Sequence, residues 1–309
     1  MLLALPPGLP SMRRLCYGFI SVMIDLHVHT TYSSDGQYSP AEILSLAACR
    51  GVRTLAFCDH MDFCAVPEGL DAARAGNVEL FSGVEISTAF KGREHHLICY
   101  GFDPLDSRIR EFIDRSCRGI WQGISAIIER FREMGFLLEE DDITGWGKSI
   151  PTGVTFLDAL VKRNPRDPRI LRYIRGDRAD SPYLNFYQDF SRAGLGEALS
   201  SGLPDLVQTL RDIEPCGILV LAHPGGMDRA SLRELQSHGV RGIEVYSTHH
   251  GPAVTGYLAG SAVSLGLLAS AGSDFHGERI KPDIRLGDAP GQPDAALIEA
   301  IREKMSAWQ

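Results

Sequence analysis

The sequence predicts an α/β fold whose strands close into a TIM-like barrel. Three observations support this prediction. Apolar segments with a period of two alternate with helical segments, seven such strand segments occur along the 309 residues, and histidines and carboxylates follow several of them. Because the carboxyl ends of barrel strands open at one face, the side chains that follow the strands are expected to share one pocket there.

The first predicted strand carries two histidines on one face. Residues 24, 26 and 28 are apolar and alternate with polar residues, so His27 and His29 point the same way. Their imidazoles, on Cα atoms about 7 Å apart, can reach a common metal ion. Short histidine pairs also arise by chance, so this pair alone leaves metal binding open.

Turn signals define the next elements. A helix is expected from Pro40 to the residue before Gly51, because proline favours helix starts and glycine follows helix ends.

The turn 91–94 is too short to hold a crossover helix and predicts a hairpin. Adjacent residues of a strand face opposite sides, so one of His95 and His96 can enter the pocket. Further strands are expected over 54–58, over 78–87 with an end near Glu85, and from His96 onward.

Strand signals stop between residues 103 and 204. A long amphipathic helix over 107–134 is followed by a loop-rich stretch with many arginines, which we interpret as an inserted helical subdomain. Strands and helices then alternate again up to a last helix over 294–305. The predicted organisation is an N-terminal extension over 1–22, a first barrel part over 23–102, the helical insertion over 103–204 and a second barrel part over 205–309. The extension is expected to be disordered or a misassigned start, with Met23 as the true beginning.

The composition is that of an ordinary globular protein. The chain is 44% hydrophobic and 23% charged, and no apolar run approaches the roughly 20 residues of a membrane-spanning helix, so no membrane partner is expected. A net charge of -8 argues against a stable nucleic-acid partner. Seven scattered cysteines without a CxxC pair argue against a disulfide framework and fit a reducing cytoplasm.

Several polar residues occupy positions in strands and turns that indicate metal binding. Glu85 lies between two apolar residues of a strand, and a buried carboxylate needs a cation or a metal. Asp274 and His276 stand two apart after an apolar strand, so both aim at one point. Asp35, in a Ser-Ser-Asp-Gly turn, is either a ligand or a turn residue, and His60 is either a ligand or a turn histidine bonded to the backbone.

Six motifs, HVH, CDH, GVEIS, HLICYG, AHP and SDFHG, resemble the ordered set of the PHP (polymerase and histidinol phosphatase) superfamily, from Met23 to about Leu286. The insertion after HLICYG resembles the branch of small-nucleotide phosphatases and 5′-to-3′ exonucleases. This resemblance implies a distorted seven-stranded (βα)7 barrel that holds three metals, with Glu85 as a bridging carboxylate. The ligands it implies are His27, His29, Asp35, His60, Glu85, His96, His223, Asp274 and His276. The chain departs from that branch at residues 152–161, where TGVTFLDALV replaces a Gly-Arg-Pro-His-like segment and its arginine and histidine are absent.

These residues favour a metal-dependent phosphoesterase. Three divalent ions carry +6 and three carboxylates supply -3, so a pocket with two to three ions suits a phosphate dianion. The expected reaction is hydrolysis of phosphomonoesters or phosphodiesters of nucleotides, short oligonucleotides or similar small molecules by a metal-bound hydroxide. Mn, Fe and Zn all suit these ligands. His249 and His250, after the strand EVYS, are candidate general acids, or else a solvated loop pair.

Two alternatives remain open. An amidohydrolase-like metal hydrolase, which cuts C–N or ester bonds, also begins with a histidine pair, but it usually carries a modified lysine at a strand end. The five lysines of this chain lie in predicted turns, loops or helices. A non-catalytic metal-binding module is the other alternative. A lost ligand would indicate it, and none of the nine ligand positions is lost.

Arginines in the insertion recur at every third residue from Arg163 to Arg178. On a helix they form a slowly winding basic stripe, which is either a guide for a polyanion or a solvated face. Prolines at 165 and 168 interrupt such a helix at its start. The candidates for substrate binding are Arg93, Arg169 and Arg172.

Overall fold

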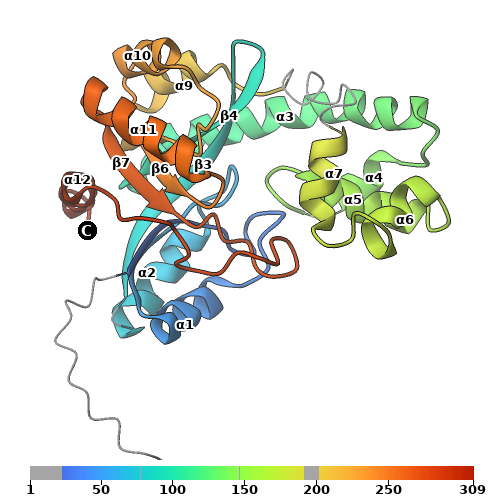
Figure 1. Ribbon diagram of the computed structural model, residues 1–309, viewed down its shortest axis with the longest axis horizontal. Coiled ribbons are helices and arrows are strands. Elements are labelled where there is room, and N and C mark those ends of the chain that lie inside the picture. The colour runs from blue at the N-terminus through green and yellow to red at the C-terminus, as the bar shows by residue number, and fades with distance from the viewer. Residues whose placement is uncertain (1–22, 77, 146, 191–201) are drawn as a thin grey trace, which may run out of the picture.

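The computed structural model describes residues 23–76, 78–145, 147–190 and 202–309. Its centre is one seven-stranded sheet in which the strands lie in chain order, surrounded by helices, and a group of further helices extends to one side (Figure 1). The expectation for residues 1–22 falls outside the described residues. The strands are β1 (Met23–Val28), β2 (Val52–Phe57), β3 (Glu79–Phe90), β4 (Arg93–Tyr100), β5 (Ile218–Leu221), β6 (Gly242–Ser247) and β7 (Leu268–Gly272).

The sheet comes close to closing on itself. After β7 the chain pairs with β1 through a parallel bridge between Val28 and Phe275. The His29 N–H donates to the Phe275 carbonyl at 2.9 Å, and the Asp274 N–H donates to the His27 carbonyl at 2.9 Å. The coarse prediction, an α/β fold with a nearly closed, barrel-like sheet, is therefore confirmed.

Strand direction is where the structure departs from a regular (βα) barrel. β4 runs antiparallel to both β3 and β5, whereas the other neighbouring strands run parallel. The cause is the two-residue turn of Lys91 and Gly92, both with positive φ (51° and 75°), which reverses the chain at once. The start of β4 therefore lies at the carboxyl end of its neighbours, which is the end that carries the predicted ligands.

Helices cover the outside of the sheet. The Pro40 helix ends before Gly51, as predicted, and it is capped by a reciprocal pair of hydrogen bonds between Ser39 and Glu42. The helices α2 and α9 were not predicted, although Asp205 caps the start of α9. The helices around the sheet are α1 (Pro40–Arg50), α2 (Ala65–Gly76), α9 (Leu206–Ile213), α10 (Arg229–Ser237), α11 (Pro252–Leu265) and α12 (Ala295–Ser306).

The remaining helices form an arm beside the barrel (Figure 1). The first half of α3 packs into the barrel core through residues such as Phe112, and its second half packs into a separate cluster with α5, α6 and α7 through residues such as Phe131. The boundaries 103 and 204 of the predicted insertion stay a prediction. Among the described residues, no helix combines the length and the apolar character needed to cross a membrane. The arm consists of α3 (Ser107–Glu133), α4 (Glu140–Thr144), α5 (Gly153–Arg163), α6 (Pro168–Arg175) and α7 (Pro182–Phe190).

Candidate metal centre

A cavity of about 520 Å³ opens between the barrel and the arm. On its barrel side the predicted ligands converge, each positioned by a strand or by the loop after it. His96 reaches the cavity because β4 is antiparallel, so its first residues lie beside the last residues of β5. From β1 and its loop come His27, His29 and Asp35, from the β2 loop His60, from β3 Glu85, from β4 His96, from the β5 loop His223, and from the β7 loop Asp274 and His276.

Glu85 does not stand at a strand end, so that part of the sequence prediction is wrong. β3 continues to Phe90, because residues 87–90 pair with the start of β4 in the hairpin. Glu85 therefore projects from the middle of a long strand, and its side chain is 1% exposed. Its alternation with Val84 and Ile86 was the informative signal, and that signal does not depend on where the strand ends.

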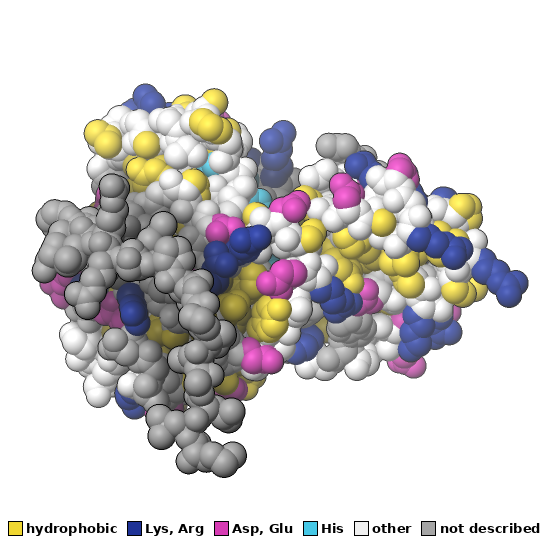
Figure 2. Space-filling view, turned by 60° about the horizontal axis from the view of Figure 1, so that its bottom comes forward, with side chains coloured by type: hydrophobic (Ala, Val, Ile, Leu, Met, Phe, Trp, Pro, Cys, Tyr) yellow, Lys and Arg dark blue, Asp and Glu magenta, His cyan; other side chains and the backbone are white. Residues whose placement is uncertain are grey.

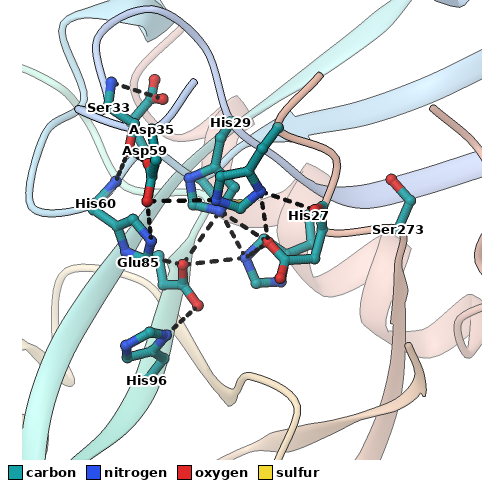
Figure 3. Close-up of polar contacts among 12 residues, drawn as sticks. His27, His29, Ser33, Asp35, Asp59, His60, Glu85, His96 and Ser273 are labelled. Atoms are coloured by element: carbon teal, nitrogen blue, oxygen red, sulfur yellow. Dashed lines mark hydrogen bonds and ion pairs between the residues drawn. The ribbon is translucent and has the colours of Figure 1, made fainter. Parts of the chain in front are cut away.

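Five histidine rings surround the Glu85 carboxylate, and Figure 3 shows four of them together with it. The separations from ring nitrogen to carboxylate oxygen are 3.3 Å for His27, 3.3 Å for His29, 3.1 Å for His60, 3.0 Å for His96 and 3.2 Å for His223. One carboxylate thus lies within reach of rings from five different parts of the chain. This arrangement fits a bridging position.

Two further carboxylates extend the cluster on either side. Asp274 lies 3.1 Å from the His29 ring and 2.6 Å from the His249 ring. Asp35 lies 3.5 Å from His60 and 3.7 Å from His276. Within the described residues, four groups of side chains have ligand atoms mutually within 4.8 Å, and together they contain all nine predicted ligands and His249.

Several buried atoms of this cluster lack a hydrogen-bond partner. They include His29 Nδ1, Glu85 Oε2 and Asp274 Oδ1. A buried polar atom without a partner costs about 1–3 kcal/mol, more when it is charged, so its presence calls for an explanation. The Nε2 atoms of His27 and His29 also lie only 3.1 Å apart. Divalent cations bound by these atoms would satisfy them, and imidazoles with carboxylates are a suitable donor set.

The charges of the cluster depend on one another. Burial by itself lowers the pKa of His29, but the nearby carboxylates of Asp274 and Glu85 outweigh it and raise that pKa to about 9. Burial likewise favours neutral Glu85, but the histidines around it, His27 first, hold its pKa well below the usual range. The site therefore retains negative carboxylates that need positive charge beside them, which metal ions can supply in place of protons.

Glu244 supports the cluster and was missed by the sequence analysis. It lies in β6, it is fully buried, and its Oε1 is 3.1 Å from His27 Nδ1, while its Oε2 accepts from the His223 N–H at 2.9 Å. A carboxylate on the far ring nitrogen fixes the orientation of a metal-binding histidine. Its signal was present in the sequence, since Glu244 stands between Ile243 and Val245 as Glu85 stands between its apolar neighbours.

Asp59, also missed, holds the loop that carries Asp35. Its carboxylate accepts from the Thr30 N–H at 2.6 Å, the Thr30 hydroxyl at 2.7 Å and the Ser33 N–H at 3.2 Å. Burial raises the pKa of Asp59 to about 6, although these donors and the charge of His29 oppose the shift. The histidine of the CDH motif therefore faces the cluster, while the aspartate beside it organises the neighbouring loop.

Two of the candidate ligands have unusual backbone conformations. His223 and Asp274 have φ values of 29° and 54°, a region that residues other than glycine seldom occupy. Such conformations cost of order 1–3 kcal/mol and cluster at functional sites. Gly272 permits the close packing nearby, because a Cβ atom there would lie 2.2 Å from the His27 Cβ. The backbone is thus adapted to the positions of the ligands.

The two candidate general acids differ in position. His249 lines the cavity, is 37% exposed and contacts Asp274. His250 is buried, its Nδ1 lies 3.1 Å from the Val245 carbonyl, and it does not line the cavity. Of this pair, the structure brings His249 to the cluster.

The candidate substrate-binding arginines do not line the cavity. Arg93 is exposed at the start of β4. Arg169 pairs with Asp167 at 2.7 Å, and Arg172 pairs with Asp177 at 2.6 Å. A role for these three residues in substrate binding stays a prediction.

Comparison with known proteins finds a family match for the part of the chain that carries the first six candidate ligands. Residues 25–139 match the family model of the PHP domain. This confirms the resemblance that the six sequence motifs indicate.

Three known proteins are similar to most of this chain, two in sequence and one in fold. A 5′-3′ exoribonuclease of Haemophilus influenzae is 29% identical to it, over 82% of this chain and 89% of that protein. A 3′,5′-nucleoside bisphosphate phosphatase of Chromobacterium violaceum is 28% identical, over 82% and 87%. A crystal structure from Bifidobacterium adolescentis, whose assignment as a metal-dependent phosphoesterase is itself a prediction, matches with a TM-score of 0.71 and 21% identity, over 91% of this chain and 96% of that one.

Proposed function

We propose that the protein is a metal-dependent phosphoesterase that hydrolyses phosphomonoesters or phosphodiesters of nucleotides, short oligonucleotides or similar small molecules. The observation that carries the proposal is the Glu85 carboxylate with five histidine rings within 3.0–3.3 Å, at the wall of a cavity. The relatives named above as an exoribonuclease and a bisphosphate phosphatase support the same chemistry.

Two to three divalent ions, of Mn, Fe or Zn, are the proposed cofactors. Glu85 would be shared between ions, with Asp35 and Asp274 on either side and the histidines completing the set. Ions bound there would polarise the phosphoryl oxygens and lower the pKa of water in the site. The three carboxylates among the ligands carry -3 against +4 to +6 from two to three ions, and this local excess favours a phosphate over a neutral substrate.

The side chains around the ligands have separate tasks. Glu244 keeps the His27 ring turned toward Glu85 by accepting from its other nitrogen. We assign His249 as the proton donor for the leaving oxygen, because it lies at the cavity and is partly exposed. Lys281 Nζ contacts Asp274 and lies 3.4 Å from His249 Nε2, so it adds positive charge where that proton is held.

The test is hydrolysis by the metal-loaded protein. After purification with Mn²⁺, a panel of nucleotides, sugar phosphates and short oligonucleotides should contain at least one substrate. Glu85→Gln should lower kcat/KM by about 10²–10³-fold or more, the scale on which loss of one preorganised electrostatic contact acts, and should lower the bound metal. Glu303→Gln, at an exposed position of α12, is the matched control and should leave both unchanged.

Either of two results would contradict the proposal. One is the absence of phosphoester hydrolysis across the panel with the metal content intact, which would favour the non-catalytic module. The other is hydrolysis of amides or carboxylic esters in preference to phosphoesters, which would favour the amidohydrolase-like alternative.

A further inference from the structure

The cavity has a second wall, and its chemistry differs from that of the metal centre. Facing the ligands are side chains from α3, α5 and α7, most of them apolar. Figure 2 shows hydrophobic side chains on the arm and where the arm adjoins the barrel. The residues that define this apolar wall are Ile124, Phe131, Val154, Phe156, Leu184 and Phe186.

The apolar wall is held in place beside the metal centre. The Ser34 hydroxyl donates to the Thr152 hydroxyl at 3.0 Å, which joins the loop of Asp35 to the start of α5. Lys148 donates to the Thr31 carbonyl, so a second contact joins the same two segments. The apolar wall therefore lies within the same cavity as the metal centre, where it can contact the rest of a substrate whose phosphate is bound there.

Positive charge is scarce in this cavity. Among the described residues that line it, Lys281 is the one lysine or arginine, and it pairs with Asp274 beside the metal centre. Arg279, which does not line the cavity, donates to Asp158 and to the Tyr183 hydroxyl. A second phosphate on the substrate, placed away from the metals, would meet apolar side chains and would lose its hydration without gaining a charged partner.

We propose that the apolar wall binds the alcohol portion of the substrate, and that the preferred substrates are phosphomonoesters with a single phosphate on an apolar alcohol or phenol. This inference rests on the proposed phosphoesterase function and places its preferred substrates among the similar small molecules rather than among the nucleotides. In the reaction a P–O bond to water forms and the P–O bond to the alcohol breaks. One proton of the water ends on the alcohol oxygen, and inorganic phosphate is the second product.

The first experiment varies the length of the alcohol while its chemistry stays constant. With the Mn²⁺-loaded protein, kcat/KM is measured for the n-alkyl phosphates from ethyl to hexyl, whose leaving alcohols have similar acidity. We expect about a fourfold rise per added methylene, which corresponds to about 0.8 kcal/mol per buried methylene. A kcat/KM that is flat or falls with chain length would overturn the inference.

The second experiment asks whether a second phosphate helps. A nucleoside 3′,5′-bisphosphate is compared with the matching 5′-monophosphate. We expect no gain in kcat/KM from the 3′-phosphate, since the apolar wall offers it no cation. A preference for the bisphosphate of more than about tenfold, 1.4 kcal/mol at 25 °C, would overturn the inference.

A pair of variants locates the effect on the wall. Leu184 lines the cavity at 44% exposure, and Ile174 on α6 is 50% exposed and does not line it, so both should tolerate a polar side chain. Leu184→Asp should lower kcat/KM for hexyl phosphate by about tenfold and flatten the dependence on chain length, because it places a charge on the wall. Ile174→Asp should leave unchanged both the kcat/KM for hexyl phosphate and its dependence on chain length. Equal effects of the two variants would contradict a role for this wall.

Binding of non-hydrolysable alkylphosphonates separates this inference from the proposed function. The affinity of the Mn²⁺-loaded protein, measured by calorimetry, should rise from ethyl- to hexylphosphonate. If no ester is hydrolysed but this rise occurs, the proposed reaction fails and the apolar wall stands. If esters are hydrolysed and neither kcat/KM nor affinity depends on chain length, the reaction stands and the apolar wall fails.

Discussion

The metal centre and the helical arm both exclude solvent, but they are built from the chain in different ways. At the metal centre, the nine candidate ligands converge from six of the seven strands or from the loops after them, β6 and its loop add Glu244 and His249, and several atoms of the cluster have no hydrogen-bond partner. In the arm, the core is a cluster of apolar side chains that all come from residues 124–190. The first region thus depends on closure of the whole sheet, whereas the second needs only its own helices.

This difference means that the two regions should respond separately to substitution. Loss of packing in the arm should lower stability without changing the metal ligands. Loss of a supporting carboxylate at the barrel end should weaken metal binding without changing the arm. The predictions below test that separation.

The largest effect is expected from the arm core. Leu160 in α5 is fully buried in the arm cluster and does not line the cavity, so Leu160→Ala should lower the free energy of unfolding by about 2–5 kcal/mol. Denaturant unfolding of the metal-free protein measures this. Bound Mn²⁺ under native conditions should stay the same. Leu105→Ala, at a position that is 77% exposed, is the control and should change the free energy of unfolding by less than about 0.5 kcal/mol.

A loss of bound metal in folded Leu160→Ala would break the comparison. It would mean that the packing of the arm determines the geometry of the ligands. The hydrogen bond between Ser34 and Thr152 would then be the first contact to suspect, since it joins the two regions.

The next effect is expected at the barrel end. Glu244→Gln keeps the shape of the side chain but removes the charge that orients His27, so it should weaken Mn²⁺ binding by about 10–100-fold. Calorimetric titration of the metal-free protein measures the affinity, with Glu303→Gln as the exposed control. An unchanged affinity would mean that the His27 ring is held by packing alone.

The sequence predicted the barrel end well because its signals are local. Glu85 was recognised by its apolar neighbours in a strand, and the same signal at Glu244 would have identified the carboxylate behind His27. His96 was placed by resemblance, and it reaches the site because the hairpin reverses β4. Which of His249 and His250 faces the cavity depends on the loop after β6, and adjacent positions in a loop carry no periodic signal.

The arm was predicted less completely. The long amphipathic helix was predicted within one residue of α3, since its apolar period continues over many turns. The short helices after it were grouped as loop-rich, because helices of five to eleven residues offer few turns over which a period can be recognised. Ion-pair partners in the arm were also beyond the sequence, since they depend on how these short helices pack.

The smallest effect is expected from the arginines of the arm. Arg172 lies on α6, and its ion pair with Asp177 at 2.6 Å is exposed on both sides (41% and 69%), so its charge is compensated locally. The cavity lining does not include it. Of the two interpretations of the basic stripe, these contacts favour the solvated face. Exposed ion pairs of this kind contribute only about 0–1 kcal/mol to stability.

Arg172→Gln should therefore change the affinity for a short fluorescent oligonucleotide by less than about twofold at low salt, since loss of a locally paired charge alters the surrounding potential little. Fluorescence anisotropy at low and at physiological salt measures the affinity, and Arg53→Gln, far from the arm in β2, is the control. A steep loss at low salt that leaves the control unchanged would instead assign the basic stripe to polyanion guidance. The arm would then attract the substrate by charge as well as bind it by apolar contact. Like the metal centre, it would act on the substrate through charged groups, which its apolar core alone does not indicate.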